Sequence, residues 1–535
     1  MKEKLIEKIN VVLKEMGVEN ADFLVEIPKD VKNGDYSSNV AMKLAKVLHK
    51  SPNEIGQEIV DKIDRDGINK VELVGPGFIN FYMEKDYLIK NIDHINEVKL
   101  DYGRNENGKG KKVNIEFVSA NPTGILHMGN ARGGAYGDSL ARIFKFNGYD
   151  VTKEYYVNDA GVQIDNLGKS IRVRYLNLLG IKEELPENGY HGNEIVDIAK
   201  ELYDKNGDSL KDADLEYFKK YGIDYLLGKI KEDLKRYRIE YDVFSSEKDI
   251  RTNYSLEEFI DKLDKNGYIY DQDGAKWFKC SLLFDDKDHV LQKEDGTYTY
   301  LMPDIIYHFD KYKRGYDKMI DVLGTDHHGY VARLKSSVKA LGNDPDKLEV
   351  KLLQLVRLME NGEVVKMSKR SGKSITLSDL MDDVGVNAAR YYFSKVSLDT
   401  QMDFNLNLAK EKSNENPVFY INYAYARICS ILSNYENEFK LDEYKTLNNE
   451  VAYSLLKVLY EWPEVVKSAS DKELPHLIAN YAYDLASAFH SYYDKVRIIS
   501  DDDVSTKENI NLLFAIKYTL KISLELIGVE PIERM

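Results

Sequence analysis

The stretch VNIEFVSANPTGILHMGNARGGAYGDSLARIFKFNGYDVTKEYYV, residues 113–157, decides the fold of this chain. Residues 113–120 form an apolar run typical of a strand, and residues 129–148 are typical of a helix that ends at Gly148. Residues 149–157 are typical of a second strand. A strand, a helix and a strand in this order make a βαβ unit, which is the seed of a parallel sheet. We therefore predict an α/β domain around this stretch.

The chain before this stretch predicts a small, separate α/β domain. Residues 71–83 contain two short apolar runs around Gly75, Pro76 and Gly77, a pattern typical of two strands joined by a turn. The polar segment 101–112 carries three glycines and no aliphatic residue, so it is the best candidate for a linker.

The chain after this stretch first continues the α/β pattern and then becomes helical. Charged helical patterns fill residues 165–265, and the run MIDVLG at 319–324 indicates a further buried strand. Asp-Gly and Asn-Gly pairs between strand-like runs predict hairpins at residues 273–274, 295–296 and 361–362. Beyond residue 405 helical patterns alternate with little strand signal, which predicts an all-α bundle.

Length, charge and cysteine content narrow the class of protein. A chain of 535 residues is long enough for about three domains. Its 75 basic and 90 acidic residues give a net charge of −15, which argues against a general polyanion binder. Only Cys280 and Cys429 are present, and they do not form a CxxC motif, so we expect no structural zinc and a reducing, cytoplasmic location. No leader or membrane-spanning pattern is evident.

The connection SANPTGILHMGNARGG follows the first predicted strand and opens the predicted helix. His127 and Asn130 are three residues apart in the first helical turn and can donate hydrogen bonds to phosphate oxygens. Gly124 shapes the loop, and Gly129 leaves room for a flat ring close to the backbone. A helix N-terminus after a parallel strand attracts phosphate. The alternative is an ordinary strand-to-helix connection with a capping loop.

A second candidate stretch is VVKMSKRSGKS, residues 364–374, which follows the predicted Asn-Gly hairpin. Lys366, Lys369, Arg370 and Lys373 gather there on a loop rich in glycine and serine. Such a loop can close over a transferring phosphoryl group and stabilise the charge that grows in its transition state. The alternative is a solvated basic loop.

Together, HMGN and KMSKR in this order resemble the paired signatures of class I aminoacyl-tRNA synthetases. The fuller resemblance, over essentially the whole chain, is to the arginyl-tRNA synthetase family, carried by residues 116–143, 323–342 and 416–432. The first signature runs through Ala120, Asn121, Pro122, Thr123, Gly124, Ile125, Leu126, His127, Met128, Gly129 and Asn130. This chain departs from the class I pattern at Met128, Asn130 and Arg370, and the asparagine puts a charged role at position 130 in doubt.

The resemblance implies three domains. The first, residues 1–105, is a small α/β domain that contacts tRNA. The second, residues 106–404, is a Rossmann-like parallel-sheet catalytic domain with an insertion at about 165–295 and the KMSKR loop at 366–370. The third, residues 405–535, is an all-α anticodon-binding bundle. The expected protein is a cytoplasmic monomer without a membrane contact.

The resemblance also implies the reaction and its substrates. L-arginine and ATP give arginyl-adenylate and pyrophosphate, and arginine then passes to the terminal ribose of its cognate tRNA. Mg²⁺ is expected with ATP, held mainly by phosphates and water, and no protein-ligated metal is expected because His327 and His328 lack a third ligand. In this family tRNA is needed for adenylate formation, which the residues themselves do not indicate.

Each site residue below is assigned because it occupies the position of a functional residue in the motifs of the family that this chain resembles. The implied ATP site comprises Gly124, His127, Gly129, Asn130, Asp326, Met367 and Lys369. The implied catalytic residues are His127, Asn130, Lys366 and Lys369. The implied arginine site comprises Glu116, Ser119, Asn121, Tyr300, Asp304 and His327. A guanidinium requires carboxylate and planar acceptors, so we assign it mainly to Asp304, with Tyr300 lining the pocket. The structural alternatives are that Asp304 caps a helix and that Tyr300 belongs to the core.

The implied tRNA contact in the last domain is Tyr420, Tyr423 and Arg427, which share one helix face. Aromatic rings can stack on unpaired bases, and arginine can meet phosphate. The alternative is a tyrosine-rich core stripe. Two other functions compete: a nucleotidyl-transfer enzyme of the same superfamily that acts on a small acid, and a tRNA-binding protein without catalysis.

Overall fold

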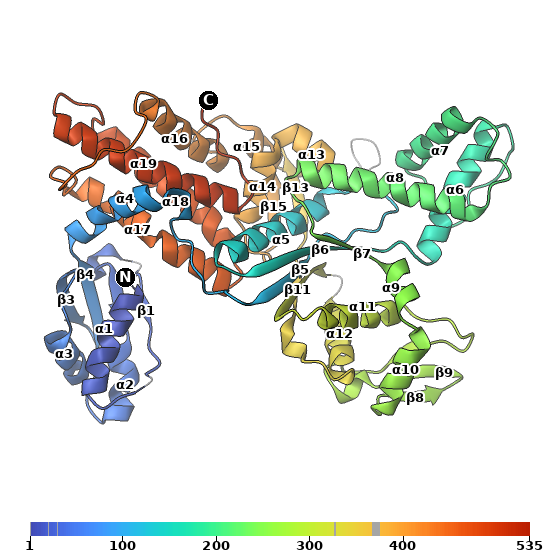
Figure 1. The fold of residues 1–535 in the computed structure, drawn as a ribbon, viewed down its shortest axis with the longest axis horizontal. Coiled ribbons are helices and arrows are strands. Elements are labelled where there is room, and N and C mark those ends of the chain that lie inside the picture. The colour runs from blue at the N-terminus through green and yellow to red at the C-terminus, as the bar shows by residue number, and fades with distance from the viewer. Residues whose placement is uncertain (1, 20, 29, 326–327, 366–374) are drawn as a thin grey trace.

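The computed structural model describes residues 2–19, 21–28, 30–325, 328–365 and 375–535. Figure 1 shows the N-terminal domain below one end of a helical bundle, with a parallel sheet beside the bundle and helical insertions extending away from it. Among the described helices, none combines the length and apolar character that crossing a membrane requires.

The central sheet has five parallel strands in the order β12-β11-β5-β6-β7. These strands are β5 Lys112–Glu116, β6 Asp150–Val157, β7 Val243–Ser246, β11 Lys318–Gly324 and β12 Leu348–Leu353. Helix α5, Met128–Phe146, connects β5 to β6, so the predicted βαβ unit is confirmed. A Cβ atom on Gly137 would lie 2.2 Å from the ring of Phe117, so the glycine lets α5 lie close to the strand end.

The insertion is not continuous, contrary to the prediction of one insert at about 165–295. Helices α6 Val162–Leu178, α7 Asn193–Asn206 and α8 Leu215–Arg236 form a helical unit with its own core. The chain then returns to the central sheet as β7 before it leaves again. Strand β7 has only four residues, VFSS, and so short a run has little strand signal of its own.

A second unit follows β7 and supplies one wall of the site. Its elements are α9 Glu247–Asn253, α10 Leu256–Lys265, β8 Ile269–Gln272, β9 Ala275–Phe278, β10 His289–Gln292, α11 Leu301–Lys313 and α12 His328–Ala340. The predicted hairpin at Asp273-Gly274 is confirmed by the antiparallel pairing of β8 with β9. The turn at Asp295-Gly296 is likewise closed by a bridge between Gln292 and Tyr298.

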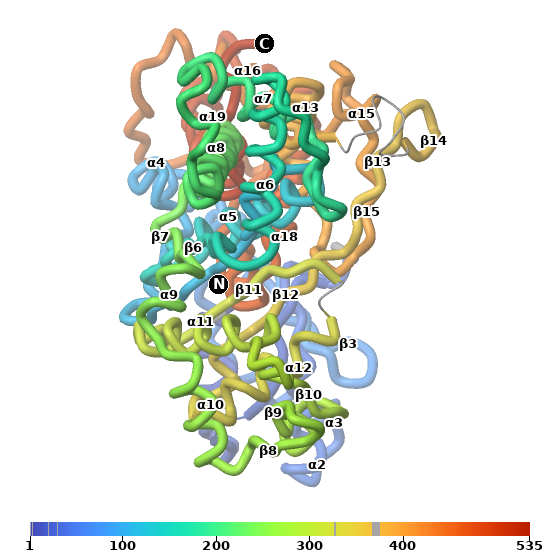
Figure 2. The backbone as a smooth tube through the Cα atoms, turned by 90° about the vertical axis from the view of Figure 1, so that its right-hand side faces the viewer, coloured from blue at the N-terminus to red at the C-terminus, as the bar shows by residue number. Residues whose placement is uncertain are grey.

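A small sheet, β14-β13-β15, joins the catalytic core to the bundle. It comprises β13 Val356–Glu360, β14 Glu363–Val364 and β15 Met402–Asn405, with α13 Leu377–Val384 and α14 Val386–Ser394 between them. The predicted hairpin is confirmed, because Asn361 and Gly362 both have positive φ, at 53° and 79°. In Figure 2 this hairpin stands out at one side of the molecule, beyond β15.

The C-terminal region is helical, as predicted. Its helices are α15 Leu406–Lys410, α16 Pro417–Leu432, α17 Glu450–Asp471, α18 His476–Lys495 and α19 Asp503–Leu526. Helix α4, Lys85–Val98, packs on this bundle although it falls in the predicted first domain, and Asn96 donates to the carbonyl of Asn511 at 3.0 Å.

The N-terminal domain has an antiparallel sheet in the order β1-β2-β4-β3 and a separate core. Its elements are α1 Lys2–Glu15, β1 Val25–Glu26, β2 Tyr36–Ser38, α2 Val40–Leu48, α3 Pro52–Lys62, β3 Ile68–Val74 and β4 Phe78–Met83. The predicted linker at 101–112 is not a free tether: Tyr102 is 2% exposed, and its carbonyl accepts the indole N–H of Trp462 at 2.8 Å.

Candidate active site

Strand β5 ends at Glu116, four residues before the first signature begins at Ala120. The two residues Val118 and Ser119 both have positive φ, at 70° and 38°, so the backbone turns sharply four residues earlier than the strand 113–120 predicted from sequence. The hydroxyl of Ser119 donates to Glu116 at 3.0 Å and accepts the backbone N–H of Tyr156. Strained non-glycine backbone of this kind concentrates at functional sites, and here it directs the following loop across the C-terminal ends of the strands.

The start of α5 is a reciprocal cap made by the two signature side chains. Asn130 Oδ1 accepts the backbone N–H of His127 at 3.0 Å, and His127 Nδ1 accepts the backbone N–H of Gly129 at 3.1 Å. Burial lowers the pKa of His127, which favours the neutral ring. Because Nδ1 accepts a hydrogen bond, the proton of the neutral ring resides on Nε2. His127 Nε2 and Asn130 Nδ2 are therefore the donors that this helix end can offer to a ligand.

The second signature meets this helix end through its C-terminal flank. Met128 donates its backbone N–H to the carbonyl of Ile375 at 3.0 Å, and Leu377 donates to the carbonyl of Leu126 at 2.9 Å. These bonds flank an antiparallel bridge between His127 and Thr376. Backbone hydrogen bonds thus join the first signature to residues 375–377, and the second signature itself, at 366–370, lies outside the described residues.

A cleft of about 230 Å³ opens beside this junction. It lies between the start of α5 and the small sheet, and its lining residues are His127, Met128, Gly129, Val356, Arg357, Leu358, Val364, Val365 and Ile375. Its walls are mainly aliphatic. A Cβ atom on Gly129 would lie 3.0 Å from the ring of His127, so a side chain there would displace that ring. An apolar slot beside phosphate-binding donors suits a flat heteroaromatic ring joined to phosphates.

On the other side of the strand ends lies a buried network of charges. Lys311 of α11 is fully buried and forms ion pairs with both Glu116 and Asp321, the latter at 2.7 Å. Tyr307 donates to Glu116 at 2.7 Å, and His308 Nε2 contacts Asp321 at 2.7 Å. Glu116, predicted to bind arginine, is therefore held firmly by the protein itself.

Asp304 of α11 lies at the edge of this network. Burial raises the pKa of its carboxyl to about 6, although the hydroxyl of Tyr330 donates to it and favours the charged form. The nearby charges of Glu247 and Glu116 raise the pKa further. A desolvated carboxylate with a raised pKa gains from a cationic ligand, so Asp304 has the properties expected of a guanidinium acceptor.

The other residues predicted for arginine lie in different surroundings. Tyr300 precedes α11 and is 73% exposed, so it is not part of the buried network around Asp304. The amide of Asn121 is exposed and donates to Gln163 at 2.8 Å. Neither residue occupies a core position, which excludes the core alternative for Tyr300 in this structure.

Five predicted residues lie outside the described part of the chain: Asp326, His327, Lys366, Met367 and Lys369.

Sequence reasoning missed three residues that contact or lie near Glu116 and Asp304. Lys311 orients Glu116, Tyr330 donates to Asp304, and Glu247, 4% exposed at the start of α9, adds negative charge nearby. Glu247 follows Ser246, whose hydroxyl caps α9. In the sequence it therefore looks like any acidic residue in the first turn of a helix. Lys311 lies seven residues after Asp304, on the same helix face, and that spacing is the one signal that could have indicated it.

The predicted stripe on α16 is present and only partly covered. The guanidinium of Arg427 lies over the rings of Tyr423 and Tyr493, at 4.4 and 4.5 Å from their centroids. Tyr420 and Tyr423 pack against the ring of His490 of α18. Both tyrosines and the arginine are half-buried, so this cluster is neither a sealed core nor an isolated surface feature.

Three family models match the chain. The arginyl tRNA synthetase N terminal domain matches residues 3–83, the class I (R) tRNA synthetase catalytic domain matches 92–397, and the DALR anticodon binding domain matches 421–535. The arginine–tRNA ligase of Geobacillus thermodenitrificans is 47% identical over 553 residues, covering 100% of this chain and 99% of the relative. That of Bacillus subtilis is 45% identical over 551 residues, again covering 100% and 99%.

Solved structures agree with these matches. A putative arginyl-tRNA synthetase from Campylobacter jejuni superposes with a TM-score of 0.78 at 34% identity, over 85% of this chain and 100% of the other. The arginyl-tRNA synthetase of Thermus thermophilus gives a TM-score of 0.79 over the full length of both chains. At 21% identity, this second likeness concerns the fold alone.

Proposed function

The chain belongs to the arginyl-tRNA synthetase family, and we propose that the junction of β5, α5 and α11 is where it activates arginine. The family's reaction is the ligation of arginine to its tRNA at the expense of ATP. The observation that carries the assignment of this site is that the neutral donors of α5 lie on one side of the strand ends and the half-buried carboxyl of Asp304 lies on the other.

The nucleotide occupies the start of α5 in this proposal. Adenine enters the apolar cleft between Met128, Gly129 and Leu358. The triphosphate then lies at the helix N-terminus, where His127 Nε2 and Asn130 Nδ2 donate to its oxygens and the helix dipole adds positive potential. Gly124, in the loop before the helix, keeps that approach free of a side chain.

Arginine occupies the opposite side. Its guanidinium pairs with Asp304, whose desolvation penalty falls when a cation binds beside it. Glu116, fixed by Lys311, and Ser119 and Asn121 hold the remaining polar groups of the amino acid, together with His327. Tyr300 is exposed without substrate, so it must move or be covered by substrate to contribute.

The chemistry needs positioning more than bond-making by the protein. An oxygen of the arginine carboxylate attacks the α-phosphorus of ATP, the bond to the bridging oxygen breaks, and pyrophosphate leaves with the electron pair. In the second step, the terminal ribose hydroxyl of tRNA attacks the arginyl carbonyl and AMP leaves. Lys366 and Lys369 neutralise charge at the transferring and leaving phosphates, while Met367 and Asp326 complete the ATP site.

Mg²⁺ accompanies ATP in this proposal as the counter-ion that neutralises the triphosphate. The described residues contain no group of three His, Cys, Asp or Glu side chains arranged to hold a metal. The ion would therefore be held by phosphate oxygens and water, and no step is assigned to a metal held by the protein.

Transfer RNA contacts three parts of one chain: the N-terminal domain, the catalytic domain and the bundle. We assign anticodon stacking to the cluster of Tyr420, Tyr423 and Arg427. Because one chain supplies all three contacts, a monomer suffices, and two free cysteines suit a reducing cytoplasm.

ATP–pyrophosphate exchange with each amino acid, with and without tRNA, tests the assignment. Wild-type enzyme should exchange with arginine, and Asp304→Ala should lose most of that exchange at low arginine. Exchange with another amino acid would contradict the arginine site, and an unchanged arginine KM in the variant would contradict the role of Asp304.

A further inference from the structure

The turn between α17 and α18 of the bundle lies against the edge of the catalytic sheet, and Glu473 of this turn forms ion pairs with two strands of that sheet. Glu473 is 5% exposed and has a φ of 57°, an unusual conformation for a residue with a side chain. A buried, strained glutamate at a domain junction is maintained only where its surroundings hold it in place.

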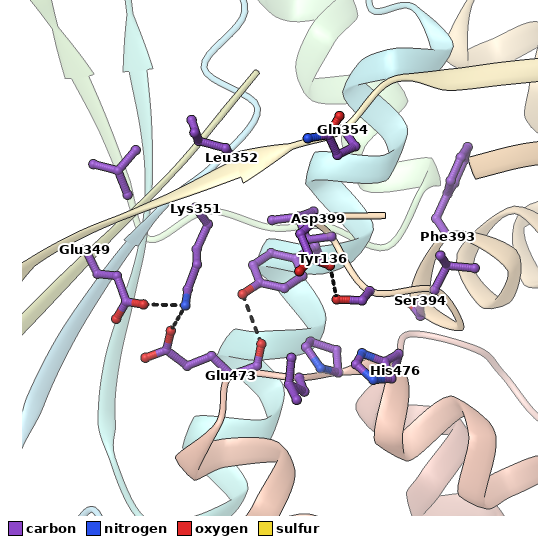
Figure 3. A pocket seen from close by; sticks show the side chains of 16 residues that line it. Tyr136, Glu349, Lys351, Leu352, Gln354, Phe393, Ser394, Asp399, Glu473 and His476 are labelled. Carbon is purple, nitrogen blue, oxygen red and sulfur yellow. Dashed lines mark hydrogen bonds and ion pairs between the residues drawn. The ribbon is translucent and has the colours of Figure 1, made fainter. Parts of the chain in front are cut away.

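Three elements of the catalytic domain hold Glu473. Its carbonyl accepts the hydroxyl of Tyr136 of α5 at 3.1 Å. Its carboxylate pairs with Lys318 of β11 and with Lys351 of β12, the latter at 2.5 Å. Figure 3 shows Lys351 between the carboxylates of Glu349 and Glu473, with the Tyr136 hydroxyl directed at the Glu473 carbonyl.

The charges in this cluster belong to different domains. Glu349 of β12 also contacts both Lys318 and Lys351, at 2.7 Å to the former. Burial opposes charge on the lysines, but hydrogen bonds to Glu349 and Glu473 outweigh it and raise the pKa of both. Burial likewise opposes charge on Glu349, and the two lysines outweigh it and lower its pKa to about 2. Glu473 is the contribution of the bundle to this cluster.

The three elements held by Glu473 all lead to the active site. Helix α5 carries His127 and Asn130 at its start, and β11 is the strand next to β5, at whose end Glu116 lies. Strand β12 continues into β13, which lines the cleft beside Met128. A shift of this one turn would therefore act on α5 and, through β12, on β13, which both line the proposed nucleotide cleft.

The junction has room for such a shift. A cavity of about 400 Å³ lies beside the cluster, between β12, α14 and the α17–α18 turn, and its walls include Phe393, Asp399 and His476. A close-packed contact would resist displacement, whereas a contact beside a cavity can adopt a second arrangement at lower cost.

We propose that Glu473 is a positioning residue that couples occupancy of the anticodon-binding bundle to the geometry of the active site. Helices α17 and α18 pack against each other, and α18 also carries the His490 ring beneath Tyr420 and Tyr423. An anticodon that stacks on that cluster can thus displace α18 and its N-terminal turn together. The inference rests on the proposed anticodon contact of α16.

Glu473→Gln tests the coupling, because it keeps the shape of the side chain and removes its charge. The measurement is kcat and KM of aminoacylation for the cognate tRNA and for the same tRNA with its anticodon bases replaced. The variant should lower kcat for the cognate tRNA by about tenfold, within the range of coupling between sites. It should leave kcat for the altered tRNA and the KM values for arginine and ATP unchanged, so that anticodon discrimination shrinks.

Two further variants distinguish a role of Glu473 in coupling the anticodon contact to the active site from a role only in stabilising the fold. Glu349→Gln removes the same charge from the same lysines but leaves the contact between domains, and it should keep wild-type discrimination. Glu473→Gly relieves the positive φ and loses the carboxylate, and it should fold well yet lose discrimination as the glutamine variant does. Equal loss of kcat with both tRNAs, or normal discrimination in either Glu473 variant, would overturn the proposal.

Binding of an isolated anticodon stem-loop tests the proposed anticodon contact of α16 separately from the coupling role of Glu473. The stem-loop should bind wild-type enzyme and Glu473→Gln with the same affinity, because the stacking cluster is intact in both. Failure to bind the wild-type enzyme would refute the anticodon contact and, with it, the coupling. Normal binding with unchanged discrimination in the variant would refute only the role of Glu473.

Discussion

Ile375 accepts the backbone N–H of Met128 at 3.0 Å, so the flank of the second signature is hydrogen-bonded to the start of the helix that follows the first. This bond and its neighbour between Leu377 and Leu126 fix the described residues that follow position 374 against the start of α5. The lysines of the loop at 366–374 lie outside the described residues. The junction shows only that the segment just after the second motif meets the segment that carries the first.

Substitutions of Asn130 distinguish its capping of helix α5 from its proposed hydrogen bond to phosphate. Asn130→Asp keeps an oxygen that accepts the His127 N–H, so thermal stability should be unchanged or higher. It removes the Nδ2 donor and puts negative charge beside the triphosphate, so kcat should fall about 10²-fold, as for loss of a positioned donor. Asn130→Ala should also lose about 1 kcal/mol of stability with the cap. Wild-type kcat in the aspartate variant would rule out a phosphate contact.

Arginine binding should depend on pH through Asp304. Its pKa of about 6 without ligand means that the carboxylate is charged above pH 6 and progressively neutral below it. Arginine binds the charged form, so its KM should rise about tenfold for each pH unit below 6. The isosteric control, Asp304→Asn, should show a high KM that does not vary with pH in this range. A flat profile in the wild-type enzyme would place the guanidinium elsewhere.

Lys311 should be required for folding as well as for positioning Glu116. Lys311→Met leaves Glu116 and Asp321 as buried charges without their cation, which should cost about 3–5 kcal/mol in the free energy of unfolding. Lys313→Met, on the same helix but exposed, should change it by less than about 0.5 kcal/mol. Urea denaturation of both variants measures the difference, and similar midpoints would contradict the network.

The aromatic cluster on α16 should contribute to tRNA affinity and not to amino acid activation. Tyr423→Ala removes a ring that can stack on a base, a loss of about 1–3 kcal/mol per base, so the KM for tRNA should rise. Tyr423→Phe keeps the ring and should bind tRNA normally. The KM values for arginine and ATP should stay unchanged in both. An unaffected tRNA KM in the alanine variant would favour the purely structural role.

Periodicity and turn chemistry were sufficient to predict most of the architecture. The βαβ unit at 113–157, the Asn361-Gly362 hairpin and the C-terminal bundle depend on local patterns that the tertiary structure did not override. Two features of the fold were not predicted. Strand β7 is four residues long and joins the sheet only because β6 pairs with it. The polar segment 101–112 looks like a linker, yet Trp462, from a distant helix, covers Tyr102.

Residues of the candidate site that belong to a sequence motif could be predicted. Residues that only the fold brings together were harder to predict. His127 and Asn130 follow directly from their spacing, and Asp304 from its position in the family. Tyr330 acts through a partner on another element, so nothing local marks it, and only its spacing from Asp304 could have indicated Lys311. Tyr300 shows the converse, since the family resemblance implied that it lines the arginine pocket, whereas it precedes the helix and is exposed.

A structure of this enzyme with arginine and a non-hydrolysable ATP analogue tests the central claim most directly. The account predicts the guanidinium within hydrogen-bond distance of the Asp304 carboxylate, and the nucleotide phosphates within reach of His127 Nε2 and Asn130 Nδ2. Adenine should fill the cleft between Met128, Gly129 and Leu358. A guanidinium bound away from Asp304, or a triphosphate away from the start of α5, would contradict it.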